Sequence, residues 1–155
     1  VEKNASSFFD SGSAALRGEA ERILSVIARE IGTLENQVYV EGHTDSRPYA
    51  RDDGNYGNWE LSVDRANAAR RVMTKDGLRP AQVKAVRGYA DTHLHPGSDP
   101  MDPKNRRVSI VVRSQLSNAQ SIGESIKMRL EEASQTRTET QTETQTQTQT
   151  QTQTH

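Results

Sequence analysis

Residues 38–45 of the chain have the sequence Val38-Tyr39-Val40-Glu41-Gly42-His43-Thr44-Asp45. The first of these residues are β-formers, which predicts a short strand. That strand carries the polar group from Gly42 to Asp45 at its carboxyl end. The next residues, 46–57, are mostly turn formers and include two tyrosines, which indicates a long surface loop. Because such loops carry function more often than average, the functional site is expected at this end of the strand.

Two helices are expected on either side of this strand. Apolar residues recur at helical spacing over residues 18–32, with a glycine at each boundary. A second helix is expected to begin around Leu61 or Ser62, and Gly77 is a suitable stop for it. Both helices show an apolar face, so both should pack against the same core.

Three further segments are predicted to be strands. Residues 7–13 form a short strand running into a turn, residues 83–89 form another, and residues 106–113 alternate cleanly between apolar and polar. The order is therefore strand, helix, strand, helix, strand, strand. This order predicts an α+β fold (βαβαββ) in which the helices cover one face of a small mixed sheet.

Composition divides the chain into three parts. Residues 1–116 hold the predicted sheet domain. Residues 117–134 have apolar positions at helical spacing, with Ser117 as the expected cap, and are predicted to form an additional helix. Residues 135–155 contain ten Thr, seven Gln and no apolar residue, so nothing offsets their ordering entropy and disorder is expected.

Length and charge limit the function classes. The 155 residues favour one domain, and 20 Lys and Arg stand against 21 Asp and Glu, so no general attraction to nucleic acid is expected. The chain has no Cys, which excludes disulfides, thiol catalysis and Cys-based zinc sites. No run approaches the 18 apolar residues of a transmembrane helix. No signal peptide is visible and Val1 is not an initiator Met, so the sequence is expected to be a mature or excised piece.

Asp45 and Arg65 are the charged pair of greatest chemical interest. A strand's carboxyl end and the amino end of the following helix meet at one rim of a sheet, which places the two side chains near each other. Together they suit a zwitterion, because Asp45 can accept from an ammonium and Arg65 can hold a carboxylate through two parallel hydrogen bonds. The alternative is that the two side chains simply pair with each other as a surface salt bridge.

Four blocks of sequence, in order, resemble the OmpA-like peptidoglycan-binding family. They are Gly42-His43-Thr44-Asp45, Asn58-Trp59-Glu60-Leu61-Ser62-Val63-Asp64-Arg65-Ala66, Asn105-Arg106-Arg107-Val108 and, for the first strand and turn, Phe9-Asp10-Ser11-Gly12-Ser13. The resemblance runs over residues 8–112. Its details are most similar to the branch of the family found in the stator of the flagellar motor.

The resemblance assigns ligand-binding roles to particular residues. It implies that Asp45 and Arg65 bind the diaminopimelate of a peptidoglycan stem peptide, whose free end carries an ammonium and a carboxylate. The other residues implied at this site lie in the matching blocks: Asn58 and Leu61 lining the same groove, Phe9 and Asp10 through their backbone, and Thr44 and Arg106. Twelve residues separate Asp45 from Asn58, a spacing that suits the stator branch.

The resemblance also implies a setting. It predicts a non-catalytic anchor that fixes a flagellar stator to the cell wall, in the periplasm, on a protein held in the inner membrane by a segment absent from this sequence. The expected partners are peptidoglycan, a second copy of the chain and a membrane subunit of the stator, with no nucleic acid. Two alternatives stay open, namely a tether between the outer membrane and peptidoglycan, and a cell-wall hydrolase.

No catalytic group, cofactor or metal is expected. His43, His93 and His95 have no acidic partner at ligand spacing, and no nucleophile motif is present. His43 is expected to be a hydrogen-bonded structural residue.

Five other side chains have both a binding and a structural interpretation. Arg106 and Arg107 resemble ligand clamps, although support of the sheet edge and its loop is favoured. Tyr49, Tyr56 and Trp59 have rings that can stack on sugars, but Trp59 is expected to be packed beside the apolar start of the second helix.

Overall fold

The computed structural model of the chain describes residues 7–49, 54–113 and 122–135. They fall into two compact units, one within Val1–Asn118 and the other within Ala119–His155. The first unit contains the sheet, and the second contains a single described helix.

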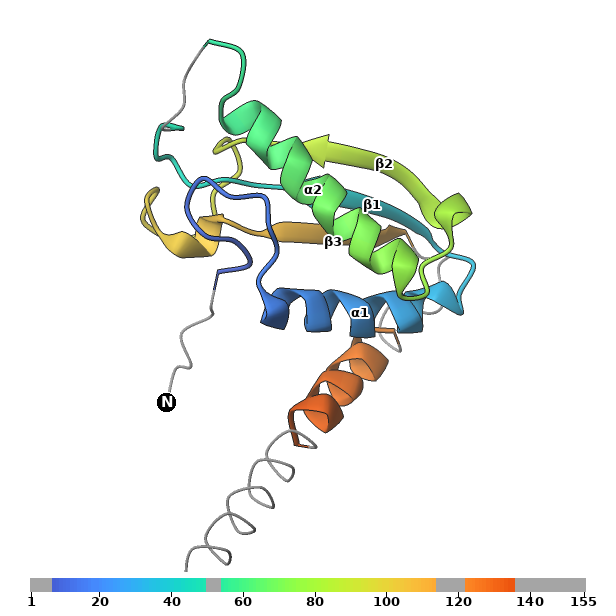
Figure 1. Cartoon of the computed structure of the whole chain (residues 1–155). Coiled ribbons are helices and arrows are strands. Elements are labelled where there is room, and N and C mark those ends of the chain that lie inside the picture. The colour runs from blue at the N-terminus through green and yellow to red at the C-terminus, as the bar shows by residue number, and fades with distance from the viewer. Residues whose placement is uncertain (1–6, 50–53, 114–121, 136–155) are drawn as a thin grey trace, which may run out of the picture. The chain divides into compact units, whose positions relative to one another are not determined.

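The sheet of the first unit has three described strands in the order β2-β1-β3 (Figure 1). The central strand β1 (Gln37–Gly42) pairs in parallel with β2 (Val83–Gly88) and antiparallel with β3 (Val108–Arg113). Val38 lies opposite Val112 and Val40 opposite Ile110, so the alternating apolar residues of β1 and β3 share one face. The sheet is therefore mixed, as predicted.

Two helices lie over that apolar face (Figure 1). Helix α2 (Asn58–Lys75) packs on β1 and β2, and α1 (Gly18–Gly32) packs beside it. Fully or almost fully buried apolar residues from both helices, β1 and the segments beside them form the core: Phe9, Ala20, Leu24, Ala28, Ile31, Val38, Val40, Leu61, Ala66, Ala69, Met73, Leu78 and Ala90. The α+β class and the covering of one sheet face are confirmed.

Two short 3-10 turns, η1 (Pro80–Gln82) and η2 (Pro103–Asn105), precede β2 and β3. The buried side chain of Gln82 fixes the first of them, because its Nε2 donates to the carbonyls of Ile31, Leu34 and Asn36 at 2.9–3.1 Å. One side-chain amide thereby satisfies carbonyl groups at the end of α1 and in the segment that leads into β1.

The predicted first strand, residues 7–13, is wrong in detail. The segment makes one isolated bridge, between Phe9 and Leu16, and contributes no strand to the sheet. Its carbonyls are used elsewhere, since Phe9 O accepts from Arg106 and Asp10 O accepts from Arg65. Arginine side chains therefore supply the hydrogen-bond donors that a neighbouring strand would provide in a sheet.

Helix α2 begins at Asn58, earlier than the predicted Leu61 or Ser62. The carboxylate of Glu60 accepts from the backbone N–H of Gly57 at 2.8 Å, which satisfies a donor at the start of the helix and stabilises the additional turn. Arg65 consequently lies two turns into the helix, where the later start had placed it one turn in.

The second unit has a helix over residues 122–135. This range overlaps the helix predicted for residues 117–134, and Gln135, which was assigned to the tail, is its last described residue. Ser117 and the rest of the Thr/Gln-rich tail lie outside the described residues.

Candidate functional site

A pocket of about 100 Å³ opens at the carboxyl end of β1. Three segments far apart in the sequence contribute to its wall, namely the turn after Phe9, the loop after Asp45 and the first two turns of α2. The lining residues are Ser11, Gly12, Asp45, Arg47, Pro48, Tyr49, Asn58, Leu61 and Arg65. Four residues predicted for the site, Asp45, Asn58, Leu61 and Arg65, are thus brought to one pocket.

Arg65 is completely buried, and three backbone carbonyls hold its guanidinium. Nε donates to Ser13 O at 2.9 Å, Nη1 to His43 O at 3.1 Å and Nη2 to Asp10 O at 3.2 Å. The group also lies 4.9 Å from the centre of the Phe9 ring. Burial lowers the Arg65 pKa to about 10, with the Asp45 charge acting in the opposite direction. Three of the five N–H donors are therefore committed to the fold, which leaves two for a ligand.

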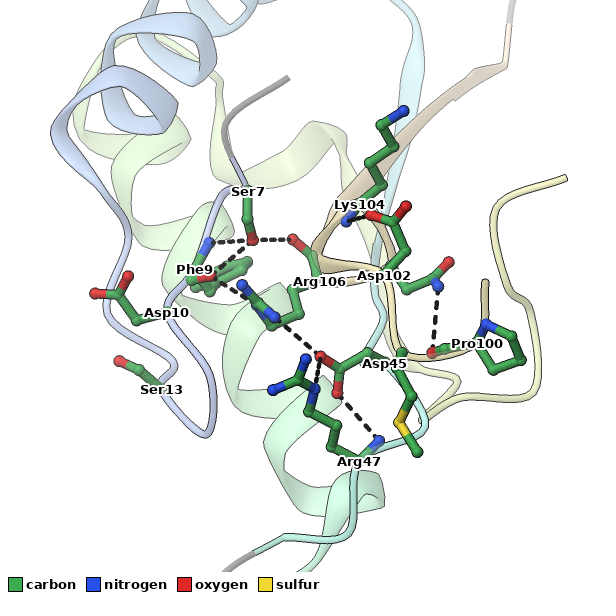
Figure 2. A network of polar contacts seen from close by, with 12 residues as sticks. Ser7, Phe9, Asp10, Ser13, Asp45, Arg47, Pro100, Asp102, Lys104 and Arg106 are labelled. Carbon is green, nitrogen blue, oxygen red and sulfur yellow. Dashed lines mark hydrogen bonds and ion pairs between the residues drawn. The ribbon is translucent and has the colours of Figure 1, made fainter. Parts of the chain in front are cut away.

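Asp45 is also buried, with a side chain 6% exposed, and its partner is Arg106 (Figure 2). The Oδ2 atom of Asp45 lies 3.0 Å from Nη1 of Arg106, and its Oδ1 accepts from the backbone N–H of Arg47 at 3.3 Å. The alternative of a surface salt bridge between Asp45 and Arg65 is wrong, because Asp45 instead pairs with Arg106 while Arg65 bonds to carbonyls.

Asn58 closes the pocket from the first turn of α2. Its Nδ2 donates to the carbonyl of Arg47 at 2.9 Å, so it ties the helix to the loop that follows Asp45. The Arg47 side chain stays 53% exposed and reaches Asp45 only at 3.9 Å, from Nε to Oδ2. The loop also carries Tyr49, whose ring contacts that of Tyr56 in a tilted arrangement, with centroids 4.9 Å apart and an interplanar angle of 52°.

The remaining predicted site residues support the pocket from outside its lining. Phe9 is buried beneath Arg65, while the Asp10 side chain is exposed and lies 4.0 Å from Arg17. Arg106 bridges the Phe9 carbonyl and Asp45. Thr44 is buried with its backbone N–H donating to Ala90 O, and its Oγ1 has no hydrogen-bond partner among the described residues.

His43 belongs to a second cluster beside the pocket. Its ring stacks on Tyr89 at 5.4 Å, and its Nε2 lies 3.2 Å from Ser109 Oγ, which agrees with the expected structural role. Burial, the Arg107 guanidinium and then His93 lower the pKa of His43 to about 4. Arg107 itself donates through Nη2 to His93 O, so it supports this loop as predicted.

Trp59 does not have the packed position expected of it. It is 57% exposed, because the earlier start of α2 places it on the outer side of the first turn. Ser11, Gly12, Arg47 and Pro48 are lining residues that were not predicted. Ser11 and Gly12 lie in the block Phe9–Ser13 that carries the resemblance, and Arg47 is a cation two residues after the key carboxylate, so these three left a signal in the sequence.

Two further observations concern the part of the chain that the structure describes. No group of three or more His, Asp or Glu side chains there is placed to hold a metal ion. No helix among the same residues has the length and apolar character needed to cross a lipid bilayer.

Comparison with known proteins identifies relatives of this domain. The sequence model of the OmpA family matches residues 8–108. Motility protein B of Escherichia coli K12 is 36% identical over 126 residues, which cover 81% of this chain and 41% of that protein. The peptidoglycan-associated lipoprotein of Pseudomonas putida is 33% identical over 104 residues, covering 66% of this chain and 60% of the lipoprotein.

A solved structure shares the fold. The crystal structure of the C-terminal domain of Helicobacter pylori MotB superposes with a TM-score of 0.66 at 23% identity, covering 79% of this chain and 94% of that one. The chain spans about two fifths of the length of the E. coli relative.

Proposed function

The chain belongs to the OmpA family, and from that membership we propose that its sheet unit is a non-catalytic anchor that binds peptidoglycan. The observation that carries the proposal is that a buried carboxylate and a buried guanidinium both reach the wall of one pocket. Polar groups fixed in a small concave site are what recognition of a small polar ligand requires. One of the relatives is named for its association with peptidoglycan.

The ligand group that fits this pocket is the free end of diaminopimelate in the stem peptide. Its carboxylate would accept from the two Arg65 N–H groups that the backbone does not use. Its ammonium would donate to Asp45, whose oxygens retain acceptor capacity beyond Arg106 and the Arg47 N–H. Leu61 and Asn58 would contact the carbon chain between the two charges.

Binding by one domain should be weak. Charge-assisted hydrogen bonds contribute about 1.5–3 kcal/mol each, before the entropy of association is subtracted. Because a small pocket offers only a few such bonds, we expect a dissociation constant in the micromolar to millimolar range, which corresponds to about −8 to −4 kcal/mol.

Co-sedimentation with purified cell-wall sacculi tests the proposal. Asp45→Asn and Arg65→Lys keep shape while removing charge or fork geometry, and both should reduce the bound fraction. Glu35→Gln and Arg71→Gln are matched controls: Glu35 lies before the opposite end of β1, and Arg71 is exposed on α2 beyond the pocket. Parent-level binding by both pocket variants would show that the pocket is not the site.

The release of soluble products distinguishes a cell-wall hydrolase from a non-catalytic anchor. An anchor releases no soluble fragments from sacculi during prolonged incubation, whereas an amidase or peptidase does. Appearance of new amino groups or free stem peptides would overturn the non-catalytic assignment.

For the whole protein, we propose a stator anchor in the periplasm, held by a membrane segment and working with a membrane subunit. The resemblance to Motility protein B over 81% of this chain supports it. A tether of the outer membrane is the second candidate, supported by the similarity to the lipoprotein. The amino-terminal segment of the full gene product discriminates: a transmembrane helix fits the stator, and a lipidated Cys fits the tether.

We also propose that the domain works as a pair. Two linked weak sites gain effective concentration without any new contact, and a two-fold pair is the commonest symmetric arrangement. Light scattering over rising concentration should detect a dimer, and a monomer throughout would contradict it for this fragment.

A further inference from the structure

Two arginines are among the described residues that line the pocket, and Arg47 is the one whose guanidinium donates no hydrogen bond to the rest of the described fold. The side chain is 53% exposed and lines the pocket, and its sole ion pair among the described residues, with Asp45, is 3.9 Å long. No acceptor in the described part of the chain lies within hydrogen-bond distance of its five N–H donors. Asn58 fixes its position instead, by donating to the Arg47 backbone carbonyl at 2.9 Å. The backbone is therefore held while the guanidinium is available to an incoming group.

The other two guanidinium groups at the pocket differ from Arg47 in this respect. Arg65 donates to three carbonyls and is buried. Arg106 donates to the Phe9 carbonyl and to Asp45, with a side chain 11% exposed. Both are fixed before a ligand arrives, and each has part of its donor set already occupied.

The charges of the described residues do not balance at this pocket. Asp45 is its one lining carboxylate, and it stands against Arg47 and Arg65 in the lining and against Arg106 at 3.0 Å. The carboxylate of Asp10, in the turn beside the pocket, is exposed and lies 4.0 Å from Arg17. An excess of cations within a small concave site favours an anionic ligand group over a cationic one.

We propose that Arg47 contacts the ligand directly and makes the pocket select a free carboxylate. The proposal rests on the proposed function: the ligand class is a stem peptide whose diaminopimelate has its distal carboxyl group unamidated. Arg47 and the two unused N–H groups of Arg65 approach that carboxylate from the loop and from the helix. Asp45, already compensated by Arg106, adds less discrimination for the ammonium than the arginines add for the carboxylate.

Three synthetic stem tripeptides ending in diaminopimelate test this by isothermal titration of the whole chain. One has a free distal carboxylate and ammonium, one has the carboxyl group amidated, and one has the amine acetylated. Amidation should weaken binding about tenfold, the effect of losing one charge-assisted hydrogen bond, and acetylation should weaken it less. Arg47→Gln should weaken the free tripeptide about fivefold and reduce the penalty of amidation to about twofold.

The controls separate charge from fold. Arg71→Gln removes the same charge from the exposed part of α2 and should leave all three affinities unchanged. Arg47→Lys keeps the charge without the fork and should recover part of the preference. The melting temperature of Arg47→Gln should match the parent, since the side chain makes no hydrogen bond in the described fold.

The outcomes distinguish the two levels of the proposal. If the protein binds sacculi but has equal affinity for the free and the amidated tripeptide, the role of Arg47 is overturned and the proposed anchor function stands. A larger loss on acetylation than on amidation has the same consequence. Failure of the parent protein to bind sacculi at all overturns the proposed function, together with the inference that depends on it.

Discussion

The carboxylate of Asp45 and the guanidinium of Arg106 form a buried ion pair, with Oδ2 and Nη1 3.0 Å apart and side chains 6% and 11% exposed. The pair joins the loop after β1 to the segment before β3, and through the Phe9 carbonyl it also holds the first turn of the domain (Figure 2). The position of Asp45 in the pocket wall therefore depends on an ion pair whose two charged groups are both buried. Such a pair contributes little beyond its desolvation penalty, but losing one partner is expensive.

Arg106→Met should destabilise the domain by about 3 kcal/mol, as expected when one partner of a buried ion pair is removed. The reason is that the buried Asp45 carboxylate loses its ion-pair partner while the Phe9 carbonyl loses a donor. Urea denaturation at neutral pH measures the change. In the double variant with Asp45→Asn, the total loss should be smaller than the sum of the two single losses. Strictly additive losses would contradict the pair.

Buried His43 predicts a loss of stability in mild acid. Its pKa is about 4 in the folded protein, below the ordinary value of 6.5, because burial, Arg107 and His93 disfavour the charged ring. The unfolded chain therefore takes up a proton first as pH falls. The contribution of His43 is complete above pH 6.5 and is lost between pH 6.5 and 4. The whole loss is about 3 kcal/mol for this one group.

The measurement is the free energy of unfolding at several pH values between 7.5 and 4. His43→Gln should flatten the slope in this range even if it lowers stability throughout. His95→Gln, a substitution at an exposed position of the neighbouring loop, should keep the parent slope. An unchanged slope in His43→Gln would assign the acid sensitivity to other groups.

The sequence predicted the layered fold because hydrophobic periodicity and strand order are local properties. Apolar spacing identified α1, and the alternation in β3 identified its buried face. The segment from residue 7 to 13 could not be predicted in this way. It has strand-like composition, but distant arginines use its carbonyls, and side chains about 50 to 100 positions away leave no local signal.

The candidate site was likewise predicted in part, in its location but not in the partners of its charged groups. Position at the strand end was sufficient to bring Asp45 and Arg65 to one pocket. Their partners were not predictable, since Arg106 approaches Asp45 only after β3 has paired with β1. Trp59 was misplaced for a simpler reason. Because α2 begins at Asn58, Trp59 lies within the helix, about 200° around its axis from the buried Leu61, and it therefore faces outward.

Trp59→Ala should change the free energy of unfolding by at most about 0.5 kcal/mol, because the side chain is 57% exposed. Met73→Ala on the same helix is the contrasting variant. Met73 is completely buried, and its truncation should cost about 2–5 kcal/mol. Denaturant titration measures both. A loss above about 2 kcal/mol for Trp59→Ala would mean that the ring packs in solution.

Gly42→Ala should be strongly destabilising, because α2 crosses β1 at this residue. A Cβ atom at Gly42 would lie 1.9 Å from the carbonyl oxygen of Ser62 and 3.0 Å from the N atom of Ala66. Both atoms belong to the helix backbone, so no rotamer change relieves the overlap and α2 must move away from the sheet. Overpacking of this kind costs about 3 kcal/mol. Movement of α2 also displaces Arg65 from Asp45, so binding to sacculi should fall even at temperatures where the variant stays folded.

Gly18→Ala is the matched control, since nothing lies within 4 Å of its added Cβ atom, and it should leave both stability and binding near the parent values. Equal melting temperatures for the two variants would show that the helix does not approach the strand this closely.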